Sequence, residues 1–96
     1  MHARVTTFSM DVSRYDEIMG VLEGVRDQIN ALPGLVSMTN TMDRESGEGV
    51  VVAIYEDADA ANANIENVQA IWANFAQYMT SEPKRAVHEV IHTYSK

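Results

Sequence analysis

The chain has no cysteine among its 96 residues. This absence excludes a disulfide framework and any thiolate metal site, and it fits a reducing compartment such as the cytoplasm. Positive charge is also scarce, because seven Lys and Arg stand against fourteen Asp and Glu, which gives a formal net charge of −7. A chain this acidic repels nucleic-acid phosphates and anionic membrane surfaces. We therefore expect a cytoplasmic protein with no nucleic-acid partner.

Long apolar runs are missing as well. No segment of about 18 apolar residues occurs, and the opening segment MHARVTTFSMD lacks the apolar core of a signal peptide. We therefore expect no membrane partner. What the chain does have is a hydrophobic content of 46 %, in a length that allows one modest core. These properties predict a single domain over residues 1–96.

Two kinds of periodicity divide the chain into six elements. Alternating apolar and polar residues predict strands, and apolar residues recurring at steps of three and four predict helices. The expected strands are residues 3–10, 35–42, 50–56 and 85–95, and the expected helical stripes are residues 15–32 and 65–79. Asp11 or Ser13 can cap the first helix, and Asp57 or Asp59 can cap the second.

The order strand, helix, strand, strand, helix, strand is that of the ferredoxin-like βαββαβ arrangement. This is an α+β fold with an antiparallel sheet and two helices on one face. The segment VVVAIY, residues 50–55, is apolar on both of its faces. A strand of this kind is buried on both faces, so we predict a homodimer in which two open sheet faces pack together. Gly20 and Gly24 in the first helix predict close packing on the sheet or on a second subunit.

The segment HEVIH, residues 88–92, matches the H-E-x-x-H pattern of zinc proteases. That pattern needs His88 and His92 one helical turn apart. In the predicted strand they lie about 13 Å apart, at roughly 3.3 Å per residue, whereas zinc ligands sit about 2 Å from the ion. We therefore expect no metal site. The two histidines are interpreted as groups on one sheet face, at an interface or a pocket wall.

With these elements, the chain resembles the dimeric α/β-barrel superfamily, in particular the antibiotic-biosynthesis-monooxygenase-like domains. The resemblance rests on the opening strand, on LPGLVSMTNTMD as a second strand begun by PG, and on GVVVAIYEDADAA as a strand leading into an acidic-capped helix with an aromatic residue. It implies that two sheets pair into a dimeric α/β barrel. It also implies that each monomer can hold a small ligand between its sheet and its helices.

The resemblance also implies site residues. Active members oxidise aromatic polyketides or haem without a conventional redox cofactor, so no cofactor is expected. Trp72 is similar to a tryptophan that lines their pocket, and Tyr78 is similar to a pocket tyrosine of the polyketide-oxidising members. The asparagine that active members place one turn before the tryptophan is Val68 here. No histidine lies between Trp72 and Pro83, where haem-degrading members carry their iron ligand.

The residues themselves leave two interpretations open at each position. Trp72 is either a core aromatic or a wall against which a flat ligand stacks. Tyr78 is either a half-exposed helix end or a polar group in an apolar pocket, and Asn40 either bonds a ligand or fills an interface. His88 and His92 titrate near neutral pH, and each is either structural or a base and hydrogen-bonding group.

Two functions follow from this reading. The favoured one is a small-ligand-binding or structural protein, which takes a small apolar or aromatic ligand at Trp72, Asn40 and His88. The alternative is a cofactor-independent monooxygenase acting on a small aromatic substrate, with Tyr78 or His92 handling protons. A sealed core around Trp72 favours the first, and an open pocket with converging polar groups favours the second.

Overall fold

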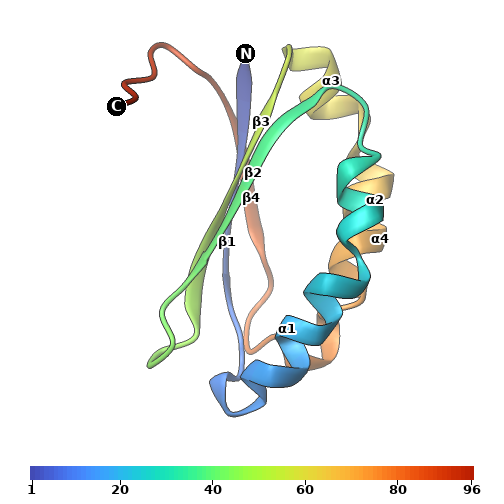
Figure 1. The fold of residues 1–96 in the computed structure, drawn as a ribbon, viewed down its shortest axis with the longest axis vertical. Helices are drawn as coiled ribbons and strands as arrows, with labels where there is room; N and C mark the ends of the chain where they lie inside the picture. The colour runs from blue at the N-terminus through green and yellow to red at the C-terminus, as the bar shows by residue number, and fades with distance from the viewer.

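A computed structural model describes residues 1–96 and shows one antiparallel sheet of four strands in the order β2-β3-β1-β4. The strands are β1 (His2–Ser9), β2 (Leu35–Met42), β3 (Glu48–Tyr55) and β4 (Lys84–Glu89). The helical segments are η1 (Val12–Arg14), α1 (Tyr15–Gly24), α2 (Arg26–Asn30), α3 (Ala58–Ala63), α4 (Ile65–Ala73) and η2 (Ala76–Tyr78). All the helices lie on one side of the sheet, and its other face is open (Figure 1). The predicted ferredoxin-like arrangement is confirmed.

Alternation along the central strands decides which side chains face the helices. In β3 the buried residues are Val51, Ala53 and Tyr55, at every second position. The register pairs Val5 with Val52, so the same alternation continues into β1. The intervening side chains project from the open face of the sheet, and the apolar ones near its centre are Val5, Val50, Val52 and Ile54.

Neither predicted helix is continuous. The first is divided at Val25, just after Gly24, a residue with low helix propensity. The second, over residues 65–79, is α-helical only to Ala73 and continues as the 3-10 segment η2. The segment that Asp57 caps is the separate helix α3, which Asn64 divides from α4; the buried Asn64 amide donates to the backbone carbonyls of Ala60 and Pro33 at 2.8 and 2.9 Å. An asparagine that bonds backbone groups in this way competes with regular helix geometry. The predicted continuous helices over residues 15–32 and 65–79 are therefore wrong, because apolar spacing does not show where the backbone leaves regular α-helical geometry.

Side-chain caps begin two of the helical segments. The Asp11 carboxylate accepts hydrogen bonds from the N–H and the hydroxyl of Ser13 at 3.0 and 2.6 Å, and these bonds lower the pKa of Asp11. The Asp57 carboxylate accepts from the N–H of Ala60 at 2.8 Å. The predicted caps at Asp11 and Asp57 are therefore confirmed.

The glycines of α1 do not pack as predicted within the chain. A Cβ atom added at Gly20 or Gly24 would meet no heavy atom within 4 Å. The predicted close approach of these glycines to the sheet is therefore wrong, because both glycines are on the exposed side of the helix.

Strand β4 is shorter than the predicted strand over residues 85–95. Its pairing with β1 ends at His2 opposite Glu89, followed by one hydrogen bond from the Val90 N–H to the Met1 carbonyl at 2.9 Å. Residues after Val90 face no strand of this sheet, so their β-prone sequence forms no ladder. Ile91 and Tyr94 are each 92 % exposed, and the tail turns away from the sheet (Figure 1). The prediction that His92 lies on the sheet is therefore wrong.

Candidate functional site

A cavity of about 310 Å³ lies between the inner face of the sheet and the helices α1, α2 and α4. Fifteen of the 18 residues that line it are hydrophobic. Ligand pockets in proteins commonly begin near this volume and combine apolar walls with a few polar groups. The cavity is therefore the best candidate for a binding site in the molecule.

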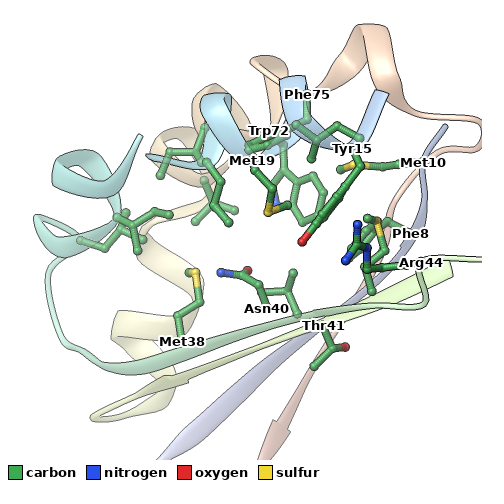
Figure 2. Close-up of a pocket in the computed structure, with 18 residues that line it drawn as sticks. Phe8, Met10, Tyr15, Met19, Met38, Asn40, Thr41, Arg44, Trp72 and Phe75 are labelled. Carbon is green, nitrogen blue, oxygen red and sulfur yellow. The ribbon is translucent and has the colours of Figure 1, made fainter. Parts of the chain in front are cut away.

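Trp72 forms the centre of an aromatic wall of this cavity. Its ring meets Phe8 edge-on, with centroids 5.5 Å apart, and meets Phe75 in the same manner at 6.2 Å. Figure 2 shows the indole at the roof of the cavity, between Met19 and Tyr15. Edge-to-face contacts hold an aromatic ring in a defined orientation. Trp72 therefore belongs to the core through its edges and also presents surface to the cavity.

Thioether side chains make up much of the remaining wall. The methionines of the lining are Met10, Met19, Met38 and Met42. Because methionine is unbranched and polarisable, it adapts to the shape of whatever it packs against. This part of the lining is therefore pliable, in contrast to the wall around Trp72.

Polar groups enter the lining from one side. Asn40 and Thr41 of β2 and Arg44 of the following turn are the lining residues that are not hydrophobic, and all three are exposed. Asn40 directs its side chain into the cavity, whereas Thr41 points away from it (Figure 2). The Arg44 guanidinium lies 4.0 Å from the centroid of the Tyr15 ring. The cavity therefore opens along the β2 edge, with polar groups at its mouth.

The turn that carries Arg44 is held in place by its own backbone. The Asp43 carboxylate accepts hydrogen bonds from two backbone N–H groups of the turn at 2.8 and 3.2 Å, and these bonds lower the pKa of Asp43. Gly47 has a φ of 81°, and a Cβ there would overlap the Met10 carbonyl. The Met10 N–H also donates to the Gly47 carbonyl at 2.9 Å. Arg44 is therefore presented from an ordered turn anchored at the end of β1.

A second polar cluster, formed by Arg4, Tyr55 and Ala61, lies at the other end of the helix layer. Arg4 is only 4 % exposed, and its guanidinium donates to the Ala61 carbonyl and, at 3.4 Å, to the Tyr55 hydroxyl. Burial lowers the pKa of Arg4. Burial also raises the pKa of Tyr55, against the opposing effect of the Arg4 charge. None of these residues lines the cavity, and their contacts are explained by packing of α3 on the sheet.

Two of the predicted site residues meet at the cavity. Trp72 and Asn40 both line it, from α4 and β2 respectively. Tyr78 does not line it, although it is buried at 5 % exposure. Its ring lies under the Arg14 guanidinium, 4.5 Å from the centroid.

The two predicted histidines lie elsewhere. His88 is opposite Ala3 in the β4–β1 ladder and is exposed on the open face of the sheet. His92 is in the exposed tail, where its ring lies 4.1 Å from that of Tyr94. The structure therefore does not bring His88 or His92 to Trp72, and their roles stay predictions. No group of three His, Asp or Glu side chains converges as a metal site would require.

Tyr15 and Arg44 were not singled out from the sequence. Tyr15 is the first residue of the predicted apolar stripe over residues 15–32, and Arg44 lies in the polar connection between two predicted strands. A signal was nevertheless present, because Met38, Asn40, Met42 and Arg44 follow one another at every second position. Extending the alternation of the strand two residues into the turn would have placed Arg44 on the face that carries Asn40.

The fold is similar to that of solved proteins over almost the whole chain. A candidate antibiotic biosynthesis monooxygenase from Nitrosomonas europaea gives a TM-score of 0.77 at 14 % identity, over 96 % of this chain and 100 % of that one. A second candidate antibiotic biosynthesis monooxygenase, from Caulobacter crescentus, gives a TM-score of 0.77 at 18 % identity, over 95 % of this chain and 90 % of that one. A protein of unknown function from Nitrosomonas europaea gives a TM-score of 0.75 at 18 % identity, over 99 % of this chain and 93 % of that one.

These similarities confirm, at the level of fold, the resemblance to antibiotic-biosynthesis-monooxygenase-like domains. No family model and no curated protein sequence matches the chain. None of the helices combines the length and the apolar character that a membrane span requires. Because one fold serves many activities, the function has to be argued from the cavity.

Proposed function

We propose that this chain, as one domain over residues 1–96, binds a small, flat, apolar ligand in the cavity beside Trp72. The supporting observation is the cavity itself, about 310 Å³ of space with a fixed aromatic wall and an opening at the β2 edge. Stacking on Trp72 suits a planar ring system. The methionines of the lining adapt to its outline, and Asn40 supplies a hydrogen-bonding group.

The test compares two phenylalanine substitutions on helix α4. Ile71 lines the cavity, whereas Ile65 is exposed on the same helix and does not line it. Emission from Trp72, the only tryptophan, is followed during titration with flat two-ring and three-ring aromatic compounds. Ile71→Phe fills the cavity and should weaken binding at least about tenfold, whereas Ile65→Phe should leave it unchanged. Equal binding by both variants, or none by the wild type, contradicts the proposal.

The second part of the proposal is a homodimer formed through the open face of the sheet. Its apolar residues Val50, Val52 and Ile54 have no covering layer within the chain. Packing a second copy on this face buries them, as a strand apolar on both sides requires. Sedimentation at micromolar concentration should show a dimer, and Val52→Lys should give monomers. A wild-type monomer under these conditions would rule the dimer out.

A cofactor-independent monooxygenase acting on a small aromatic substrate is the second candidate. It is favoured by the description of several structural neighbours as candidate antibiotic biosynthesis monooxygenases. Within this proposal Tyr78 or His92 handles protons, yet neither lines the cavity. Binding is therefore the better-supported function. Oxygen consumption with any compound that quenches Trp72, set against the same assay in Ile71→Phe, distinguishes the two.

A further inference from the structure

The cavity lining has a charge opposite to that of the chain as a whole. The chain carries fourteen acidic residues, yet none of them lines the cavity. Arg44 is the only charged residue of the lining. The only formal charge in the cavity lining is therefore positive, on a protein of net charge −7.

No carboxylate of the chain forms an ion pair with Arg44. The two ion pairs of the structure join Arg14 to Glu17 at 2.8 Å and Arg26 to Glu23 at 2.6 Å. Arg44 takes part in neither of them. Its guanidinium instead lies over the Tyr15 ring, 4.0 Å from the centroid.

The Arg44 guanidinium lies over the Tyr15 ring and takes part in no ion pair, so its N–H donors are available to an anion. Those donors form a planar fork that matches the two oxygens of a carboxylate. Tyr15 therefore acts as a support that orients Arg44 at the mouth of the cavity.

Asn40 adds a second polar group on the same wall. It lies on the inner face of β2, opposite Val51, and its side chain points into the cavity (Figure 2). Asn40 and Arg44 thus follow one side of the opening, with Met42 between them. Both are exposed, so a charged group bound there keeps contact with water and avoids the large desolvation penalty of a buried ion.

We propose that the cavity selects flat apolar carboxylic acids, with the ring system beside Trp72 and the carboxylate on Arg44 at the mouth. This inference rests on the proposed function, because it names the class of ligand that the same cavity takes. The apolar walls supply most of the affinity, and Arg44 supplies the preference for an anion over a neutral analogue.

The experiment uses two probes of nearly equal shape, 2-naphthoate and the neutral 2-naphthamide. Binding of each is measured by calorimetry at low salt. Wild-type protein should prefer the carboxylate by about tenfold, which is the effect of one partly exposed, charge-assisted contact. This preference should shrink as salt is raised, because the contact lies at the surface.

Variants at Arg44 separate its charge from its packing. Arg44→Gln should bind both probes equally, at the affinity that the wild type shows for the amide. Arg44→Lys keeps the charge but loses the planar fork, so it should retain part of the preference. Arg26→Gln is the matched control, because Arg26 is paired with Glu23 and does not line this cavity, and its preference should equal that of the wild type.

The outcomes separate the inference from the function on which it rests. Equal affinity of the wild type for the two probes, or an unchanged preference in Arg44→Gln, overturns the role of Arg44 while ligand binding in the cavity still stands. Failure of both probes to bind the wild type removes the proposed function together with the inference. Thermal unfolding of each variant verifies that a lost preference is not a loss of fold.

Discussion

At the α3 end of the molecule, helix and sheet meet through alanines, whereas at the α1 and α4 end methionines and aromatic side chains hold them apart. Tyr55 and Ala61 at the α3 end have no exposed surface at all. A Cβ added at Gly34 would lie 2.6 Å from the Cβ of Ala60, which shows how closely the backbones approach there. The other end contains the cavity of about 310 Å³.

The difference shows that side-chain size decides how closely each part of the helix layer packs on the sheet. Small residues let α3 approach the sheet and form a dense interior, in which packing gives stability. Large residues on α1 and α4 leave unfilled volume, which adds nothing to stability. We call the α3 end the closed end and the α1 and α4 end, which contains the cavity, the hollow end. The arginines differ in the same way, since Arg4 is buried at the closed end and Arg44 is exposed at the hollow end. The closed end therefore maintains the fold, and the hollow end is free to bind.

The largest expected effect comes from truncating an aromatic side chain at the closed end. Tyr55→Ala should destabilise the protein by about 3–5 kcal/mol, because it opens a void among atoms that cannot collapse and removes a partner of Arg4. Trp72→Ala should cost less, since part of the indole already borders empty space. Urea unfolding followed by circular dichroism measures both. Equal losses would mean that the two ends are packed alike.

Enlarging a side chain should cost more stability at the α3 end than beside the cavity. Ala61→Leu forces extra volume into the closed end and should destabilise by about 1–3 kcal/mol. Val68→Leu adds a methylene group beside the cavity and should change the free energy of unfolding by less than about 0.5 kcal/mol. Thermal unfolding of the two leucine variants gives the comparison. If Val68→Leu proved the more harmful, the cavity would be smaller in solution than in the structure.

Glycine-to-alanine substitutions should act in opposite directions at the two ends. Gly34 has a φ of 74° and no room for a Cβ, so Gly34→Ala should destabilise by at least about 1 kcal/mol. Gly20 lies in α1 with open space around it, so Gly20→Ala should stabilise by about 0.5–1 kcal/mol. Both values come from the midpoints of urea unfolding. Destabilisation by Gly20→Ala would indicate that a second subunit packs against that position.

The smallest expected effect is a fall in the free energy of unfolding at alkaline pH, which is absent at neutral pH. Burial raises the pKa of Tyr55 above its ordinary value of 10.0. A raised folded-state pKa gives stability that is complete below the unfolded pKa and is lost as pH rises through the folded value. The free energy of unfolding should therefore fall above about pH 10. Tyr55→Phe should reduce this fall, and an identical alkaline profile in the variant would show that Tyr55 is not its source.

Local pattern was sufficient to predict the fold, although not the points where its elements break or end. Apolar periodicity located the strands and helical stripes because inner-face residues such as Val51 and Tyr55 recur at fixed steps. It missed the break at Asn64, which lies just before the predicted stripe, because the hydrogen bond from the Asn64 amide to the Pro33 carbonyl joins residues distant in sequence. It also extended the last strand too far, because a strand needs a partner, and alternation alone does not reveal where the partner ends.

The candidate site was only partly predictable for a related reason. Trp72 and Asn40 were selected by residue type and reach the cavity. Tyr78 was selected in the same way, but the 3-10 segment η2 turns it into the core instead. Arg44 lies beyond the predicted end of β2, so its place beside Asn40 follows from the sequence only if the strand alternation is extended into the turn that Asp43 and Gly47 hold.

The methionines of the lining have a practical consequence for the chemist who looks for the ligand. The lining methionines are Met10, Met19, Met38 and Met42, and their flexible side chains can adapt to ring systems of different outline. Small changes in the ring system of a ligand should therefore change its affinity little. Replacing the ligand's carboxylate at the mouth by a neutral group should change its affinity more. A compound collection is best sorted by end group first and by ring outline second.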